Sequence, residues 1–321
     1  MKELVHRIQQ SQRIVVISHI HPDGDAVGST LGLFLALKQL GKDVHGVLRD
    51  GVPKIFSFLE GYEGIENTLP LDADLYIVLD ASDALRTGFV EQIKALSREK
   101  KLAFIDHHPK GDLMRLASFS VHRTTASSAA ELVYEVIQEL EVKLTSSIAT
   151  ALLTGMYTDT GGFQFPNTSN FVLEYSAELM RRGAQLNKIV QHISHQKSMV
   201  TLKLLGIALE KLLVTQKGSV AVSALTQADI QECGATPEDL TGIVNELNVL
   251  PQVEFSLLLS EVDLGEVRGS LRTADGKDFN VGRIASLLGG GGHPRAAGFS
   301  VPGHLVALPE GGWRVEPFLV S

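Results

Sequence analysis

The chain has a single cysteine, Cys233, among its 321 residues, so it cannot form an internal disulfide. It has no apolar run near the ~20 residues that a membrane-spanning helix needs, and its N-terminus shows no signal-peptide pattern. These absences exclude a disulfide-stapled secreted domain and argue against an association with membranes. We therefore expect the protein to work in the reducing cytoplasm.

Basic charge is also scarce. The chain has 29 basic and 37 acidic residues, a formal net charge of −8, and no basic run longer than Arg181-Arg182. Proteins that bind long duplex nucleic acid usually have a basic face, because much of their affinity comes from basic side chains that neutralise the charges of the phosphates. The composition therefore argues against a long duplex as a partner and indicates that any nucleotide substrate is short.

The composition is otherwise that of a globular protein, with 44% hydrophobic and 21% charged residues. In the first half, short β-branched apolar runs alternate with amphipathic segments. This alternation predicts an α/β fold with a doubly wound parallel sheet. The predicted strands are 14–17, 44–48, 75–79 and 102–105, and the predicted helices are 26–40, 90–98, 127–140 and 146–157.

The second half predicts a smaller α/β domain. A helix at 169–182 and a long helix at 187–213 come first, and the long helix suits a connector between domains. Beyond it, the expected elements are a strand at 220–222, a helix at 237–247, a hairpin of 254–260 and 266–273, a helix at 281–288 and a strand at 297–301. We therefore predict a first domain at 1–190, a helical linker at 191–215 and a second domain at 216–321.

Acidic and imidazole side chains follow three of the predicted strands. His19, Asp23 and Asp25 follow the first strand, Asp80 follows the third, and Asp106-His107-His108 follow the fourth. Ligands of open α/β sheets bind at the carboxyl ends of the strands, so these side chains should meet. Asp159, at the predicted end of the 146–157 helix, is a further candidate.

This set of residues predicts a metal centre. Mixed carboxylate and imidazole ligands suit Mn²⁺, Fe²⁺ or Zn²⁺ better than Mg²⁺, which prefers oxygen ligands alone. These groups are too many for one catalytic ion with an open position, but they suit two ions ~3.5–4 Å apart that share a bridging aspartate. Any one of these short motifs also arises by chance on a solvated loop, whereas their repetition at successive strand ends does not.

The same segments, in this order, resemble the four motifs of the DHH phosphoesterase superfamily. The matching segments are His19 to Ser29 (HIHPDGDAVGS), Asp80 to Asp83 (DASD), Asp106 to His108 (DHH) and Thr158 to Gly161 (TDTG). The tail from Gly289 to Phe299 (GGGGHPRAAGF) resembles the signature of the DHHA1 substrate-binding domain. Together they are similar to the two-domain branch of bacterial nanoRNA hydrolases (oligoribonucleases) and 3′-phosphoadenosine 5′-phosphate (pAp) phosphatases.

The resemblance implies a role for each matching residue in the first domain. One Mn²⁺ would be bound by His19, Asp23 and Asp80. The second would be bound by the residues Asp25, Asp80, His107 and Asp159, with Asp80 bridging the two ions. His108 would face the scissile phosphate as a catalytic group, and Asp106 would orient the imidazoles. For His21 the resemblance implies no ligand role, and a contact with phosphate stays open.

The resemblance implies that the second domain binds the substrate in a cleft between the domains. Arg272 matches the arginine of the family that contacts the substrate, although a surface salt bridge is the alternative. The other predicted substrate residues are Gly290, Gly291, Gly292, His293 and Arg295. The glycine run would cradle a phosphate with its backbone N–H groups, or it is only a flexible turn.

These observations predict a Mn²⁺-dependent phosphoesterase with a two-metal mechanism in which a bridging hydroxide attacks phosphorus. The expected substrates are short single-stranded oligoribonucleotides, released as mononucleotides, and pAp, converted to AMP. A phosphodiesterase of cyclic or linear dinucleotides stays open as an alternative enzyme, and a catalytically silent nucleotide sensor as an alternative of another class. The resemblance also allows a homodimer.

Overall fold

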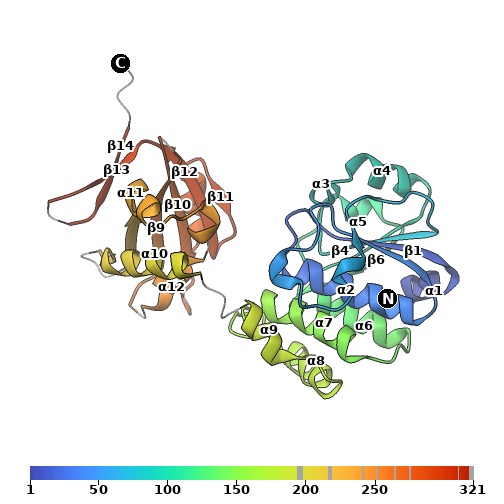
Figure 1. The fold of residues 1–321 in the computed structure, drawn as a ribbon. Coiled ribbons are helices and arrows are strands. Elements are labelled where there is room, and N and C mark those ends of the chain that lie inside the picture. Colours follow the sequence, from blue (N-terminus) through green and yellow to red (C-terminus); the bar gives the residue numbers. More distant parts are fainter. Residues whose placement is uncertain are drawn as a thin grey trace. The chain divides into compact units, whose positions relative to one another are not determined.

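The computed structural model describes residues 1–193, 198–215, 219–240, 242–250, 252–263, 265–274, 276–309 and 311–317. The chain forms two compact units, Met1–Gln196 and Lys197–Ser321 (Figure 1). Both are α/β, and the second is the smaller one. Among the described residues, no helix combines the length and the apolar composition that a membrane span requires.

The first unit contains a parallel sheet of six strands in the order β3-β2-β1-β4-β5-β6. This confirms the predicted doubly wound sheet. The chain order reverses at β1, which lies between β2 and β4, and such switch points are where open α/β sheets bind ligands. The strands are β1 (Arg13–Ile17), β2 (Asp43–Val47), β3 (Ile65–Glu66), β4 (Leu75–Leu79), β5 (Leu102–Asp106) and β6 (Phe119–His122).

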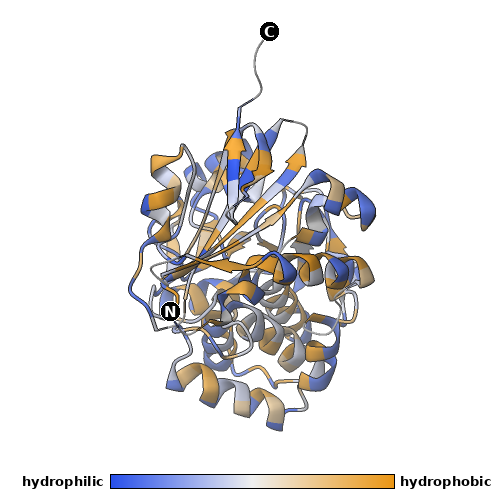
Figure 2. Cartoon of the chain, turned by 90° about the vertical axis from the view of Figure 1, so that its left-hand side faces the viewer, coloured by the Kyte–Doolittle hydropathy of each residue, from blue (hydrophilic) through white to orange (hydrophobic). Residues whose placement is uncertain are grey.

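Helices cover both faces of this sheet, because alternate side chains of each strand point to opposite faces. Ile14 and Val16 of β1 belong to one core and Val15 and Ile17 to the other, and the hydrophobic residues are orange in Figure 2. The first core is closed by α1 (Lys2–Gln10), α2 (Gly24–Gln39), α6 (Ala129–Glu139) and α7 (Ser146–Asp159). The second is closed by α3 (Ala84–Thr87), α4 (Val90–Arg98) and α5 (Leu113–Leu116).

Helices α2 and α7 approach so closely that their backbones touch. A Cβ atom built on Gly28 of α2 would lie 2.5 Å from the carbonyl oxygen of Ala151 and 2.7 Å from the amide nitrogen of Gly155, both in α7. Only glycine fits there. The glycine at position 28 therefore serves the contact between two helices.

The prediction of one long helix at 187–213 is wrong. The structure has α8 (Asn170–Arg181) and then two shorter helices, α9 (Leu186–Ile193) and α10 (Met199–Glu210). Ser198 caps α10, because its hydroxyl accepts a hydrogen bond from the N–H of Thr201 at 3.0 Å. Helix α10 then packs against the sheet of the second unit through Leu204 and Ala208, so it is not a free connector.

The second unit has a mixed sheet in the order β11-β12-β10-β9-β8-β7, in which only the pair β8–β9 is parallel among the described strands. The strands are β7 (Leu213–Val214), β8 (Val220–Leu225), β9 (Phe255–Asp263), β10 (Glu266–Thr273), β11 (Gly291–Gly292) and β12 (Ala296–Pro302). A hairpin of β13 (His304–Ala307) and β14 (Trp313–Glu316) follows.

Short helices complete the second unit. The helix predicted at 237–247 is divided into the 3₁₀ turn Pro237–Leu240, α12 (Ile243–Glu246) and the 3₁₀ turn Leu247–Val249. Helices α11 (Gln227–Glu232) and α12 pack with α10 in one apolar cluster, and α13 (Val281–Leu287) belongs to another. Two further 3₁₀ turns, Lys54–Phe56 and Tyr62–Gly64, lie in the first unit.

Candidate metal centre

The structure brings the predicted acidic and imidazole residues of the first unit together at the carboxyl ends of its strands. His19 follows β1, Asp80 follows β4, and Asp106 ends β5 and leads into His107. Two helices complete the set, with Asp25 in the first turn of α2 and Asp159 as the last residue of α7. Within each ligand group described below, the candidate ligand atoms lie within 4.8 Å of one another.

The first ligand group consists of His19, Asp23 and Asp80. The Nε2 atom of His19 lies 3.4 Å from Oδ2 of Asp80 and 3.8 Å from Oδ1 of Asp23. Its Nδ1 atom lies 2.8 Å from the carbonyl oxygen of Ile20. Since that carbonyl only accepts, Nδ1 must donate, and Nε2 then offers its lone pair to a metal ion.

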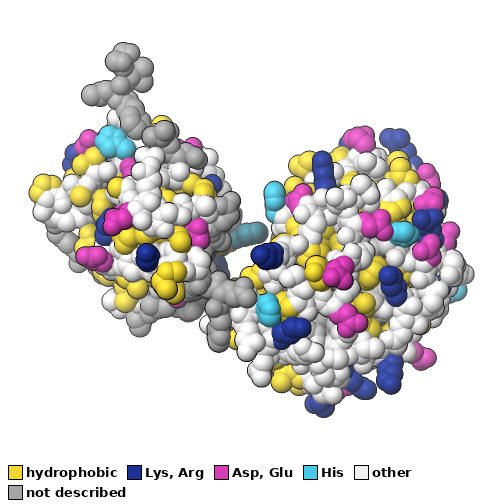
Figure 3. Space-filling model, viewed as in Figure 1, with side chains coloured by type: hydrophobic (Ala, Val, Ile, Leu, Met, Phe, Trp, Pro, Cys, Tyr) yellow, Lys and Arg dark blue, Asp and Glu magenta, His cyan; other side chains and the backbone are white. Residues whose placement is uncertain are grey.

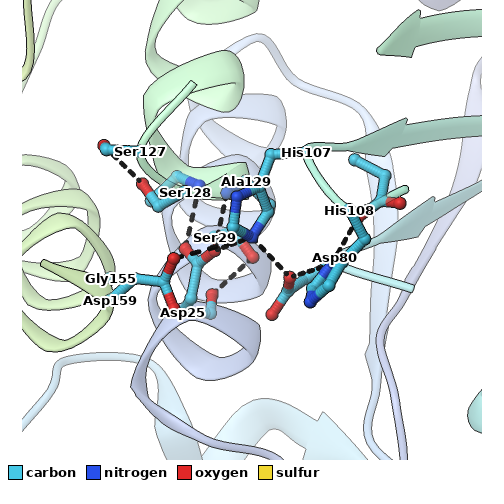
Figure 4. Close-up of polar contacts among 12 residues, drawn as sticks. Asp25, Ser29, Asp80, His107, His108, Ser127, Ser128, Ala129, Gly155 and Asp159 are labelled. Carbon is cyan, nitrogen blue, oxygen red and sulfur yellow. Dashed lines mark hydrogen bonds and ion pairs between the residues drawn. The ribbon is translucent and has the colours of Figure 1, made fainter. Parts of the chain in front are cut away.

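The second ligand group consists of Asp25, His107 and Asp159. The Nε2 atom of His107 lies 3.6 Å from Oδ2 of Asp159 and 3.9 Å from Oδ2 of Asp25, and it also lies 3.5 Å from Oδ1 of Asp80 (Figure 4). The two oxygens of Asp80 therefore face different ligand groups.

These residues fit metal ions better than they fit one another. Separations of 3.4 to 3.9 Å are too long for good hydrogen bonds. Two ligands that each lie ~2.1 Å from one ion, at roughly 90–110°, are themselves about 3.0–3.5 Å apart. His19 Nε2, His107 Nε2 and Asp80 Oδ1 are buried and have no hydrogen-bond partner in the described part of the chain. Such atoms are costly unless a ligand satisfies them.

Asp80 has an unusual backbone conformation. Its φ of +53° lies in the left-handed region, which aspartate tolerates better than most residues. Its side chain is 2% exposed. Burial alone would raise the pKa of Asp80, but the contacts with the imidazoles of His107 and His19 lower it to about 2. Asp80 therefore stays ionised between the two ligand groups.

Each residue of the second group has a raised pKa when no metal is bound. Burial and the charges of Asp80 and Asp159 raise the pKa of Asp25 well above its usual value. Burial and the nearby charge of Asp80 raise the pKa of Asp159 to about 6, against the opposing charge of His107. Burial alone would lower the pKa of His107, but the contact with Asp80 and the charges of Asp25 and Asp159 raise it to about 10. A metal ion must displace these protons, because only the neutral imidazole and the ionised carboxylate are ligands.

We expect the affinity for Mn²⁺ to rise with pH. Below about pH 6, binding releases the proton of Asp159 in addition to that of His107, whereas above pH 6 Asp159 is already ionised. A plot of log affinity against pH should therefore be steeper below pH 6 than between pH 7 and 8. Isothermal titration calorimetry with Mn²⁺ in two buffers of different ionisation enthalpy measures both affinity and proton release. An affinity that is constant from pH 5.5 to 8 would contradict this ligand assignment.

His108 and Asp106 form a pair beside the ligand groups. The Nδ1–H of His108 donates to Oδ1 of Asp106 at 2.9 Å, and the same nitrogen lies 3.4 Å from Oδ1 of Asp80. Asp106 is 1% exposed, whereas the side chain of His108 is 28% exposed. The bond at Nδ1 leaves Nε2 of His108 available to a substrate. A residue that we did not predict, His122 of β6, donates from Nε2 to the carbonyl oxygen of His108 at 2.7 Å.

Asp83 and His21, two further polar residues of the resembling motifs, also lie outside both ligand groups. The Asp83 carboxylate accepts hydrogen bonds from the N–H of Asp112 and the hydroxyl of Ser82, and the first of these bonds is the main cause of its lowered pKa. It thus joins the loop after β4 to the loop after β5. His21 has an 88% exposed side chain, which lies 3.4 Å from Asp50.

Arg272, at the end of β10, is partly buried and has no carboxylate partner among the described residues. Its Nε–H donates to the side-chain oxygen of Asn245 at 2.9 Å, and one terminal N–H donates to the carbonyl of Leu271. Burial lowers the pKa of its guanidinium. An unpaired, partly desolvated guanidinium is suited to an anionic ligand. The surface salt bridge that we considered as the alternative is not formed with any described residue.

The glycine loop lies next to Arg272, because Arg272 is paired with Ala296 across β10 and β12. His293 and Arg295 are exposed there. Part of the loop has a structural role: the N–H of Gly290 donates to Ala285 at the end of α13, and a Cβ on Gly290 would lie 2.1 Å from the carbonyl oxygen of Gly298. That N–H is therefore already engaged, whereas Gly291 and Gly292 form β11 at the edge of the sheet and are exposed.

Comparison with known proteins gives one consistent result. The DHH family N-terminal domain matches residues 13–156, and the DHHA1 domain matches residues 201–310. A Thermus thermophilus protein described as bifunctional oligoribonuclease and PAP phosphatase NrnA is 32% identical over 90% of this chain and 84% of its own length. The Bacillus subtilis protein of the same name is 27% identical over 93% and 92%. Among solved structures, an exopolyphosphatase-related protein of Bacteroides fragilis superposes with a TM-score of 0.83 at 26% identity, over 93% of this chain and 89% of that one.

Proposed function

This chain belongs to the DHH family and is a phosphoric ester hydrolase, and from that premise we propose that it hydrolyses short oligoribonucleotides to mononucleotides and pAp to AMP. The observation that carries the proposal is the position of Asp80, one oxygen of which lies near His19 of the first ligand group and the other near His107 of the second. Two relatives whose names state these two activities match the chain over nearly its whole length.

We propose that the two groups bind two Mn²⁺ ions. His19, Asp23 and Asp80 would bind one ion, and Asp25, His107 and Asp159 would bind the other together with Asp80. Two bound ions lower the pKa of water to produce a nucleophile and stabilise charge on the phosphoryl oxygens. The protein's contribution is to hold ionised carboxylates and neutral imidazole nitrogens in a buried, preorganised set.

The other proposed residues act on the substrate. His108, held by Asp106 through Nδ1, would present Nε2 to the scissile phosphate and either neutralise its charge or donate a proton to the leaving oxygen. Arg272, His293 and Arg295 would bind another anionic group of the nucleotide, with Gly291 and Gly292 beside them. A short substrate suits the surface, since acidic and basic side chains are interspersed on the face shown in Figure 3.

The test is an activity panel with Mn²⁺ in excess. It contains a ribonucleotide dimer, a ribonucleotide pentamer, pAp, a cyclic dinucleotide and pyrophosphate. We expect release of mononucleotides from the dimer and pentamer, and AMP from pAp. Turnover of the cyclic dinucleotide alone would favour the alternative phosphodiesterase, and binding without turnover of any compound would favour a nucleotide sensor.

Chelation of divalent metal should abolish activity, and Mn²⁺ should restore it better than Mg²⁺. Imidazole nitrogens, here His19 and His107, bind Mn²⁺ more readily than Mg²⁺. We expect a rate on the order of tenfold higher with Mn²⁺ at matched concentration. The measurement is pAp hydrolysis after dialysis against EDTA and readdition of each metal. Equal recovery with both metals would argue that the imidazoles are not ligands.

A further inference from the structure

The N-terminus of helix α6 holds the carboxylate of Asp25. The N–H of Ala129 donates to one oxygen at 2.6 Å, and the N–H of Ala130 donates to the other at 2.9 Å. These are the first two residues of α6, whose amide groups have no acceptor within the helix. Figure 4 shows Asp25 facing this end of the helix. Asp25 is 1% exposed, so these two bonds replace the water that the carboxylate loses.

The backbone around these two N–H groups is fixed by the side chains of Ser128 and Glu131. Ser128 caps the helix by accepting a hydrogen bond from the N–H of Glu131 at 3.1 Å. The carboxylate of Glu131, 2% exposed, accepts from the N–H of Ser127 at 2.8 Å and from Arg123 at 2.9 Å. The serine and the acid three residues later resemble a capping box, with the acid bonded one residue further back.

Helix α7 closes another side of the same carboxylate. A Cβ atom built on Gly155 would lie 2.7 Å from Oδ1 of Asp25 and 2.6 Å from the Cβ of Ala130. Three helices therefore confine Asp25: α2 carries it, α6 donates to both of its oxygens, and α7 packs against it through a residue without a side chain. In such a site a small shift of α6 would change the direction of the carboxylate.

We propose that Glu131 and Ser128 are positioning residues for the metal centre, because they set the N-terminus of α6 so that its N–H groups hold the carboxylate of Asp25 directed at the second ligand group. This inference rests on the proposed metal-dependent function. Hydrogen bonds to both oxygens fix the plane of the carboxylate, and a metal ion needs its ligand oxygen held in one direction. Outer groups that orient a ligand typically change metal affinity by ~10–100-fold.

A purely structural role makes a different prediction. If Glu131 only stabilised α6, its loss would lower thermal stability and leave the affinity of both metal sites unchanged. If it positions Asp25, one site should weaken selectively, since among the described residues no hydrogen bond or ion pair joins His19, Asp23 or Asp80 to α6. Affinity for Mn²⁺ therefore separates the two roles where activity alone would not.

The test compares Glu131→Ala with the matched control Glu135→Ala. Both remove a carboxylate that pairs with Arg123, but Glu135 has no hydrogen bond to the segment 127–130. Mn²⁺ binding is followed by electron paramagnetic resonance of the free ion, and the melting temperature of each metal-free variant is recorded. In Glu131→Ala we expect one site with unchanged affinity and one weakened by roughly 10–100-fold, and in Glu135→Ala two unchanged sites.

Two further variants keep the test decisive if Glu131→Ala does not fold. Glu131→Gln retains an oxygen for the Ser127 N–H and should keep most of the affinity, whereas Ser128→Ala should weaken the same single site. Unchanged affinity of both sites in folded Glu131→Ala or Ser128→Ala would overturn the inference. If the unmodified protein itself binds no Mn²⁺, the proposed function fails instead, so the two failures can be told apart.

Discussion

Asp80→Asn should reduce phosphoesterase activity by on the order of 10³-fold or more while the protein stays folded. Asp80 is the residue whose two oxygens face both ligand groups. Without the charge of Asp80 the two ions would be held poorly, and the transition state would lose several kcal/mol of the stabilisation that they supply. A loss of ~4 kcal/mol lowers the rate by ~10³-fold. Asparagine is a better replacement than alanine, because Asp80 has a positive φ that asparagine tolerates. Hydrolysis of pAp with Mn²⁺ in excess measures the loss, and circular dichroism checks the fold.

The matched control is Asp83→Asn, three residues further along the same loop. Asp83 joins two loops through hydrogen bonds and lies outside both ligand groups. Asparagine keeps an acceptor there, so activity should fall by no more than about tenfold. Near-normal turnover of Asp80→Asn would remove the two-ion proposal. An inactive Asp83→Asn beside an active Asp80→Asn would show that the ligand assignment is wrong.

Arg272→Ala and His293→Ala should impair nucleotide substrates severely and a small generic ester hardly at all. An anion contact that holds substrate equally in the ground and transition states affects KM alone, whereas one that also aligns the scissile phosphate affects kcat. Because a misplacement of ~1 Å can cost ~100-fold, we expect kcat/KM for pAp to fall by about that factor through both parameters. Bis(p-nitrophenyl) phosphate has no second anionic group and should retain most of its rate.

Arg268→Ala is the control for this experiment. Arg268 is an exposed arginine on the same strand, β10, and no carboxylate of the described residues pairs with it. Its loss should change neither substrate. A parallel decrease on bis(p-nitrophenyl) phosphate in Arg272→Ala would mean that Arg272 takes part in the chemical step. Unchanged pAp kinetics in both variants would mean that the glycine loop is only a turn.

The grouping of the candidate ligands in the first unit could be predicted largely from sequence, because most of them follow short apolar strands. Parallel strands bring their carboxyl ends to one edge, so the residues after β1, β4 and β5 had to be neighbours. The closeness of Asp159 depended on where α7 ends, and the helical pattern from Ser146 indicated that end to within two residues.

Other features could not be read from the sequence. Backbone donors have no sequence signature of their own: Ala129 and Ala130 look like ordinary core residues, and only Ser128 followed by Glu131 hints at a helix start. The apolar pattern runs through Ser198 without a visible break, so the separation of α9 from α10 was missed. Asn245 reaches Arg272 only through the packing of α12 on the second sheet.

The contact between Gly28 and Gly155 also bears on when the enzyme can acquire metal during synthesis. Helix α2, which starts at Gly24, packs its backbone against a helix that is translated more than a hundred residues later. Long-range contacts form late, after the loop between them has closed. A ribosome-bound chain that has not yet reached Ser146 lacks both the candidate ligand Asp159 and the helix that packs against α2, so metal loading should follow completion of α7.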